Sequence, residues 1–154
     1  MEYTFIMIKP DGVRKGLVRE ITERIDKAGL QIVKFDVRKL EGNTIDEHYS
    51  HLVEKHFYPS LKSFMSSDYV VPMIVYGENA ISAMRSMMGP TKSAEAPKGT
   101  IRGDFGDKEI VTYNIIHGSD SPESANIEIK RFFNIDIPEL EQEMENRKVK
   151  YISR

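Results

Sequence analysis

The spacing of apolar residues along this chain switches repeatedly between a period of two and a period near 3.6, and this alternation narrows the possible folds. The shorter period is typical of a strand and the longer one of a helix. We expect strand, helix, strand, two helices, strand, helix, strand and helix, in that order. The 154 residues are enough for one domain with a substantial core and too few for two ordinary domains.

This order favours a ferredoxin-like α+β sandwich, with a four-stranded antiparallel sheet and helices covering one face. We infer that the other face of the sheet is exposed to solvent, because Val33, Phe35 and Val37 alternate with charged residues. The expected strands are 3–9, 33–37, 70–76 and 110–116. The expected helices are 18–28, 44–53, 61–65, 81–88 and one that begins at 120 or 121 and runs to 133.

Several local signals refine these bounds. Gly29 and Gly89 are expected to end helices, and Thr44 with Glu47 matches a capping box. Pro72 favours the edge of a sheet or the start of a strand. Residues 90–108 show no periodicity, and a loop of that length inside a compact domain is usually functional.

Composition excludes several classes of function. The formal net charge of -2 gives no global field for duplex nucleic acid or an anionic membrane, so any anion site must be local. The chain has no cysteine, which excludes disulfides and thiolate metal sites. No signal peptide and no run of about 20 apolar residues is found, so a cytoplasmic protein is expected.

The segment from Asn114 to Ser121 is the strongest candidate for chemistry. An apolar, β-branched run brings His117 to a small polar turn, and Asp120 or Ser121 can cap the helix that follows. A neutral imidazole beside helix-start N–H groups can attack a phosphoryl group. The alternative is a histidine that only hydrogen-bonds a turn. Asn114 and His117 are three residues apart, so a strand that presents both to one site must bend or end between them.

Three motifs in this order resemble the nucleoside diphosphate kinase family, over about residues 3–133. The motifs are Phe-Ile-Met-Ile-Lys-Pro-Asp-Gly at 5–12, Gly-Thr-Ile-Arg-Gly-Asp-Phe at 99–105 and Asn-Ile-Ile-His-Gly-Ser-Asp-Ser at 114–121. The resemblance implies that His117 takes the γ-phosphate of a nucleoside triphosphate, typically ATP, and passes it to a second nucleoside diphosphate. It therefore implies a ping-pong kinase with a phosphohistidine intermediate and broad base specificity.

The resemblance also implies a role for each matching residue. Glu128 would hold the second ring nitrogen of His117, Ser119 would contact that glutamate or the phosphoryl group, and Tyr49 would lie near the histidine. Arg85, Thr91 and Arg102 would contact phosphates. Lys9 would reach the ribose and the phosphates, Asn114 would hold the sugar hydroxyls, and Phe57 would stack on the base.

General chemistry agrees with these assignments but leaves simpler roles open. The chain has neither a P-loop nor a dinucleotide-binding fingerprint, so side chains must replace a glycine-rich phosphate cradle. The forked guanidinium groups of Arg85 and Arg102 suit phosphate oxygens. Alternatively, Arg85 completes a helix end, Arg102 and Lys9 are solvated charges, Phe57 and Tyr49 are core residues, and Glu128 is an exposed helix acid.

Magnesium is the expected cofactor, held mainly through the nucleotide phosphates, because no tight carboxylate pair offers a dedicated protein site and the family is similar in this respect. Asp120 is interpreted as a cap or loop brace. His48, His51 and His56 could in principle bind zinc, but they lack the pairing with a glutamate that metalloproteases use and are interpreted as a solvated helix face.

The whole chain, 1–154, is expected to form a single domain with a charged tail at 136–154. Acidic residues precede basic ones in this tail, which fits a solvated helix or an arm that wraps a neighbouring subunit. The resemblance implies a homo-hexamer that binds ATP, GTP, ADP and other nucleotides, with no obligate nucleic acid and no membrane. However, the tail lacks the family's usual aromatic ending, which leaves a tetramer open.

Two rival classes are weighed against the kinase. A regulatory nucleotide-binding module would share the fold and lack turnover, but such a copy would usually lack one of the matching site residues. An RNA-binding ferredoxin-like domain would need exposed aromatic residues and a basic face on the central strands, and the sequence shows neither clearly.

Overall fold

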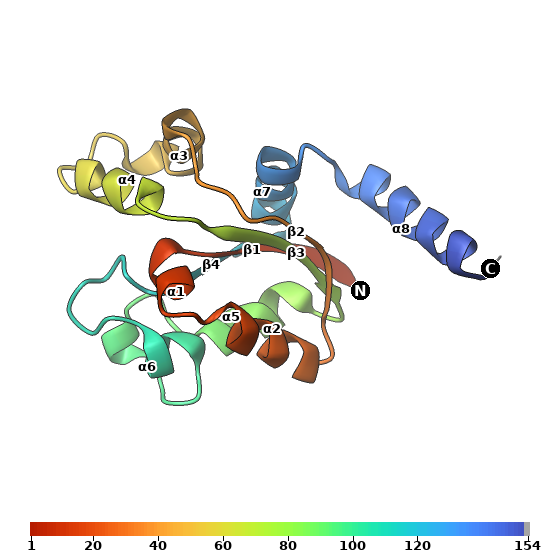
Figure 1. Ribbon diagram of the computed structural model, residues 1–154, viewed down its shortest axis with the longest axis horizontal. Coiled ribbons are helices and arrows are strands. Elements are labelled where there is room, and N and C mark those ends of the chain that lie inside the picture. Colours follow the sequence, from red (N-terminus) through yellow and green to blue (C-terminus); the bar gives the residue numbers. More distant parts are fainter. Residues whose placement is uncertain (153–154) are drawn as a thin grey trace.

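The computed structural model describes the backbone of residues 1–152 and the side chains of residues 1–148. Its centre is a four-stranded antiparallel sheet with the strand order β2-β3-β1-β4 (Figure 1). The strands are β1 (Glu2–Ile8), β2 (Gln31–Phe35), β3 (Val71–Gly77) and β4 (Ile116–Gly118). The expected α+β class with an antiparallel sheet is confirmed.

Helices connect the strands in the expected order, with two short additions. The helices are α1 (Pro10–Arg14), α2 (Val18–Lys27), α3 (Gly42–His48), α4 (Tyr58–Ser66), α5 (Ala80–Met88), α6 (Ile101–Phe105), α7 (Pro122–Phe133) and α8 (Ile137–Ile152), with 3₁₀ turns η1 (Ser50–Leu52) and η2 (Ser93–Glu95). Gly29 and Gly89 follow α2 and α5 with positive φ, as expected for residues that end helices. Ser121 caps α7 by accepting a hydrogen bond from the Ser124 N–H.

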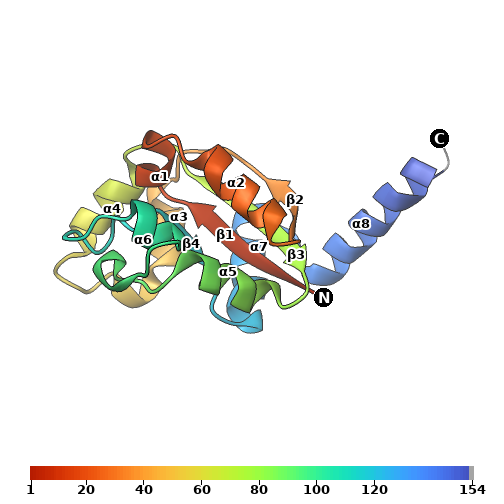
Figure 2. The same ribbon diagram turned by 90° about the horizontal axis from the view of Figure 1, so that it is seen from below.

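Helices cover both faces of the sheet, so the expectation of one covered face is wrong. Along β1, Phe5 and Met7 pack into one core with α3, α4, α7 and α8, whereas Ile6 and Ile8 pack into a second core with α2, α5 and α6. The two helix layers lie above and below the sheet in Figure 1, and Figure 2 shows α2 and α5 across the lower face. No face of the central strands is therefore open for RNA bases.

The edge strand β2 explains that error. Val33 is buried, but Phe35 is 67% exposed and Val37 is 54% exposed, so the alternation did not mark a buried stripe. The pairing of β2 with β3 shifts at Val33, which changes the direction of the following side chains. Pro72 lies in β3, an interior strand, at its second residue. The start of the strand was therefore the correct alternative, and the sheet edge was not.

Three other expectations also need correction. The predicted strand 110–116 is β4, which covers only residues 116–118, because the segment before it folds into a turn held by Asp107, which accepts hydrogen bonds from the Glu109 and Ile110 N–H groups. The supposed loop 90–108 contains η2 and α6, which are too short to show periodicity. Helix α3 begins after Glu41 with no side-chain cap, so Thr44 and Glu47 do not form a capping box.

Within the charged tail predicted at 136–154, α8 (Ile137–Ile152) extends away from the sheet in both views (Figures 1 and 2), and residues 153 and 154 lie outside the described residues. Contacts at Leu140 and Arg147 attach the helix to the body. Leu140 is fully buried in the core, and Arg147 donates a hydrogen bond to the Val33 carbonyl at 3.2 Å. In the described part of the chain, none of the helices has the length and apolar character needed to cross a membrane.

Candidate active site

A cavity of about 540 Å³ lies where the end of β1, β4, α7 and the α3 to α4 segment meet. It brings together residues that are far apart in sequence. Nine of the residues predicted from the sequence line it: Lys9, Tyr49, Phe57, Arg85, Thr91, Arg102, Asn114, His117 and Glu128. Ser119 is buried directly beneath Glu128 and contacts it.

His117 lies in the middle of β4, opposite Met7 of β1, and its ring is held by a carboxylate from α7. Its Nε2 lies 2.5 Å from Glu128 Oε2, and the Ser119 hydroxyl donates to Glu128 Oε1 at 2.5 Å. Glu128 is almost fully buried. Its negative charge is therefore stabilised by the two hydrogen bonds that it accepts rather than by water. A carboxylate accepts from N–H, which assigns the ring proton to Nε2 and leaves the lone pair on Nδ1.

The bend expected between Asn114 and His117 is present at Ile115. Its φ of 75° is rare for a β-branched residue, and the Ile116 N–H donates to the Asn114 carbonyl at 2.9 Å, which closes a tight γ-turn. Asp11 holds this turn through Oδ2, which accepts the Ile115 N–H at 3.0 Å. A side chain from the first motif therefore fixes the backbone that carries His117.

Two buried cations and one amide form the floor of the cavity. The Lys9 ammonium donates to Asn114 Oδ1 at 2.9 Å and to the Thr112 carbonyl at 2.5 Å. The Arg102 guanidinium donates to the carbonyls of Gly89 and Ile116 at 2.9 and 2.6 Å. Both cations are thus positioned before any ligand binds.

Burial is the main influence on both cations. It lowers the pKa of Lys9 to about 8, with Asp11 opposing the shift. It also lowers the pKa of Arg102 to about 10, and the nearby Arg85 adds to the shift. Two buried cations that line the same cavity favour a polyanionic ligand.

The remaining predicted residues lie around the rim. Arg85, in the last turn of α5, is exposed and makes only a long 3.4 Å contact with the Gly118 carbonyl. Thr91 is exposed, and its carbonyl accepts a hydrogen bond from the Asn114 amide at 3.0 Å. The ring of Phe57 is 40% exposed before α4, as a stacking platform requires. Burial, reinforced by Glu128, raises the pKa of the half-buried Tyr49.

The comparison with known families agrees with this geometry. Residues 2–137 match the family profile described as nucleoside diphosphate kinase. This chain belongs to the nucleoside diphosphate kinase family. It is therefore a phosphotransferase of that class.

Individual relatives also align with most of this chain. The nucleoside diphosphate kinase of Streptococcus agalactiae serotype III (strain NEM316) is 44% identical over 137 residues, which cover 87% of this chain and 99% of the relative. That of Archaeoglobus fulgidus is 46% identical over 136 residues, covering 88% of this chain and 89% of the relative.

Solved structures of nucleoside diphosphate kinases share the fold. The apo enzyme of Encephalitozoon cuniculi superposes with a TM-score of 0.83 at 37% identity, covering 89% of this chain and 92% of that one. The Halobacterium salinarum enzyme in complex with CDP gives a TM-score of 0.82 at 37% identity, covering 90% of each chain.

Two cavity residues of this nucleoside diphosphate kinase were missed from the sequence. The sequence predicted that His48 is part of a solvated face, but it is only 7% exposed. Its ring packs edge-on against that of His117, with the ring centroids 4.7 Å apart. Arg131, from α7, donates to His48 Nδ1 at 2.9 Å. The available signal was that His48 follows Ile45 by three residues and so shares its buried helix face.

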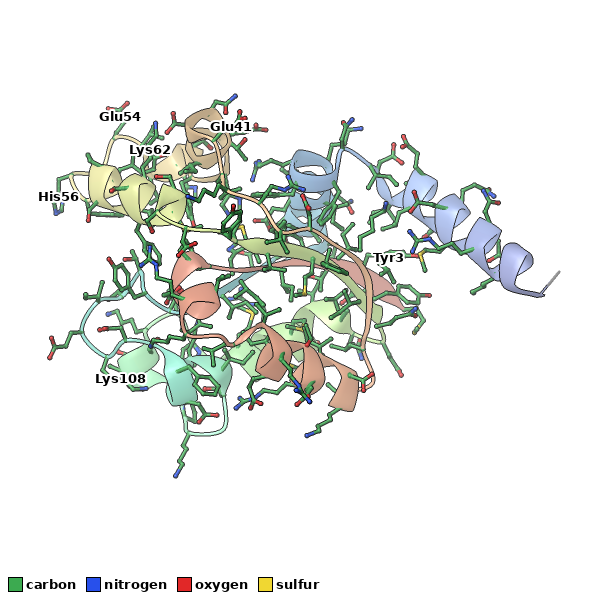
Figure 3. The ribbon with its side chains drawn as sticks, in the orientation of Figure 1. Tyr3, Glu41, Glu54, His56, Lys62 and Lys108 are labelled. Carbon is green, nitrogen blue, oxygen red and sulfur yellow. The ribbon has the colours of Figure 1, made fainter. Side chains whose placement is uncertain are left out.

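The three histidines do not form a zinc site together. His51 and His56 are exposed, and His56 points outward beside α4 (Figure 3). Only His48 lies close to other metal-ligating groups, those of His117 and Glu128, within 4.8 Å. The Arg131 guanidinium already occupies the His48 nitrogen there, which opposes binding of a cation.

Proposed function

We propose that this kinase transfers the γ-phosphate of a nucleoside triphosphate to a nucleoside diphosphate through a phosphohistidine at His117. The observation that carries the proposal is the contact between His117 Nε2 and Glu128. This contact fixes the tautomer in which Nδ1 is the nucleophile, and it does so inside a cavity lined by Lys9, Arg85 and Arg102.

The first half-reaction is an in-line displacement on the γ-phosphorus. The Nδ1 lone pair forms an N–P bond while the bond from phosphorus to the β–γ bridging oxygen breaks, and the diphosphate leaves with that electron pair. The proton on Nε2 stays in place, and Glu128 stabilises the positive charge that develops on the ring. The second half-reaction reverses these steps with an oxygen of another nucleoside diphosphate as the acceptor.

The nucleotide would lie with its phosphates towards the cations and its base at the rim. Arg85, Thr91 and Arg102 would contact phosphates, Lys9 would reach both the ribose and the phosphates, and Asn114 would hold the ribose hydroxyls. The exposed ring of Phe57 would stack on any base, since every base has a π face, which supports broad base specificity over ATP, GTP and other nucleotides. The complex of a related enzyme with CDP agrees with nucleotide binding in this family.

The donor set of the cavity fits magnesium that arrives on the nucleotide. Mg²⁺ prefers oxygen ligands and keeps several waters. In the part of the chain that the structure describes, the only cluster of metal-ligating groups contains two imidazoles, which suit Mg²⁺ poorly. The rim carboxylate of Asp120 already accepts a hydrogen bond from Ser124 at 2.7 Å. The phosphates of the nucleotide would therefore supply the oxygen ligands. Bound on the phosphates, the ion would neutralise charge beside Arg85 and Arg102.

The test is to label the protein with γ-labelled ATP in the absence of an acceptor. We expect protein-bound phosphate that is labile in acid and stable in base, and that any added nucleoside diphosphate removes. His117→Ala should lose labelling and exchange while still binding ADP, whereas the exposed His56→Ala should label normally. Exchange that survives in His117→Ala contradicts the proposal, and ADP binding by the native protein with no labelling favours the regulatory module.

We further propose a homo-hexamer and a cytoplasmic location, both on the basis of the family resemblance. In such an assembly the projecting α8 is available to contact a neighbouring subunit. Native mass spectrometry of the purified protein measures the subunit number, and a tetramer is the result that would contradict the hexamer.

A further inference from the structure

The hydrogen bond between Arg131 and His48 determines the protonation of His48. Arg131 Nη1 lies 2.9 Å from His48 Nδ1. A guanidinium has only donors, so this nitrogen of His48 must carry a lone pair, and the ring proton must be on Nε2. His48 is therefore neutral, and its Nδ1 is occupied.

The same nitrogen is a potential competitor for the catalytic carboxylate. His48 Nδ1 lies 3.6 Å from Glu128 Oε2, the oxygen that accepts from His117 Nε2 at 2.5 Å. The planes of the two imidazole rings lie at 82° to each other, and each ring presents a nitrogen to this oxygen. If His48 Nδ1 carried a proton, it would become a second donor to that oxygen and weaken its hold on His117.

We propose that Arg131 is a positioning residue that reserves Glu128 for His117 by keeping His48 Nδ1 unprotonated. This inference rests on the proposed phosphohistidine function, because the orientation of His117 affects the reaction rate only if His117 is the nucleophile. Arg131 lies three residues after Glu128 on α7, so one helix supplies both the carboxylate and the group that protects it.

The surroundings of His48 support this role. Burial lowers its pKa to about 2, and the neighbouring His117, Arg131, His51 and Lys9 add to the shift. Glu128 faces it and favours the charged ring, and Glu47 lies behind Arg131 at 3.5 Å. Removing Arg131 removes one cation and the occupant of Nδ1, and leaves the carboxylate in place. The pKa of His48 then rises, and protonation pairs it with Glu128 as the pH falls.

The first experiment measures the rate of phosphorylation in a single turnover against pH, from about pH 5.5 to about pH 8.5. For Arg131→Ala we expect about a tenfold loss at the acid end, a smaller loss at the alkaline end and unchanged ADP affinity. Arg131→Lys should recover much of the rate, because an ammonium also donates. Lys130→Ala, the exposed neighbour on α7, is the matched control and should follow the native profile.

A second variant separates competition from general damage. In Arg131→Ala combined with His48→Phe, the competing nitrogen is absent, so the acid-side loss should disappear. A loss that persists in the double variant overturns the proposal, because the competing nitrogen is absent there.

Imidazole ¹⁵N chemical shifts give a readout that does not depend on activity. In the native protein, His48 should keep the proton on Nε2 across this pH range, and in Arg131→Ala it should titrate. A native His48 with its proton on Nδ1 refutes the inference whatever the rate data show. If native protein takes no label from ATP although these shifts behave as expected, the proposed function fails and the Arg131 arrangement stands.

Discussion

At the scale of single residues, the burial of Lys9 connects nucleotide binding to pH. Lys9 is 5% exposed, and its ammonium is held by Asn114 and the Thr112 carbonyl rather than by a carboxylate. These hydrogen bonds and the nearby Asp11 offset only part of the cost of removing the charge from water, so burial lowers the pKa to about 8. Bound phosphates would supply the missing negative charge.

We therefore expect nucleotide affinity to fall as the pH rises through about 8 and the amine loses its charge. The loss of one charge-assisted hydrogen bond should weaken ADP binding about tenfold between about pH 7 and about pH 9.5. Calorimetric titration with ADP measures it. Lys9→Met should bind weakly at every pH, and if its alkaline loss equals that of the native protein, another group is responsible.

The same proton affects the stability of the unliganded protein with the opposite sign. The unfolded chain holds the lysine proton up to its ordinary pKa, whereas the folded chain releases it above about 8. Between these values the unfolded state binds more protons, so this group makes the free energy of unfolding rise with pH.

Half of the ten predicted site residues lie in three short motifs whose residues are close in sequence, and the other half were predicted from the family resemblance alone. The lysine before Pro10, the arginine between Ile101 and Gly103 and the histidine before Gly118 are examples of the motif residues. His48 and Arg131 could not be found this way, since their contact joins α3 to α7 across 83 residues and depends on how those helices pack. The predicted roles of the site residues remain predictions until the variants are measured.

At the scale of elements, the turn that precedes β4 depends on α1. Ile115 has a positive φ, and its N–H is buried against Asp11 Oδ2. A β-branched residue in this conformation costs about 1–3 kcal/mol, so the surrounding contacts must hold it. Asp11 supplies the one side-chain hydrogen bond to that N–H within the described residues.

We expect Asp11→Ala to lower the free energy of unfolding by about 2 kcal/mol, because it leaves a buried N–H without an acceptor. The phosphorylation rate should fall with it, since the backbone that carries His117 loosens. Urea unfolding and single-turnover labelling measure the two effects. Asp11→Asn keeps an acceptor and should lose less, and the exposed Asp26→Ala should change neither; native stability in Asp11→Ala would contradict this account.

The sequence predicted long elements better than short ones. α2, α5 and α7 have at least nine residues each and show a clear apolar stripe, so their positions were correct. β4 and α6 have three and five residues; β4 is held by its pairing with β1, and α6 by contacts such as that of Thr100 with the Gly103 N–H. Those contacts have no periodic signal.

At the scale of the whole molecule, the second helix layer follows from the central strands. In β1 and β3 the runs 5–8 and 71–75 are buried without interruption. Strands buried on both faces have continuous apolar runs, whereas the alternating β2 segment is a sheet edge. The continuous apolar runs of β1 and β3 therefore predict a sheet covered on both faces, whereas the alternation in β2 describes only the edge of the sheet.

α8 should stabilise the molecule without taking part in the reaction. Leu140 is fully buried in the core between the sheet and the helices α3, α4 and α7, and none of the α8 residues whose side chains are described, 137–148, lines the cavity that contains His117. We expect Leu140→Ala to cost about 2–5 kcal/mol in the free energy of unfolding, with normal exchange per folded molecule. Chemical denaturation measures this loss, and the exposed Glu139→Ala serves as the control. A proportional loss of exchange in fully folded protein would show that α8 reaches the site.

The pairing of β1 with both β3 and β4 determines when the strand that carries His117, the proposed nucleophile, is assembled during folding. The first strand synthesised must wait for residues 71–77 on one side and for residues 116–118 on the other. Contacts this distant in sequence form late, because the loop-closure entropy is lost before they are made. Asp11 likewise has no Ile115 to hold until the last strand arrives. If His117 is the nucleophile, a growing or shortened chain should therefore have no partly active form, and phosphoryl transfer should begin only when β1 and β4 have met.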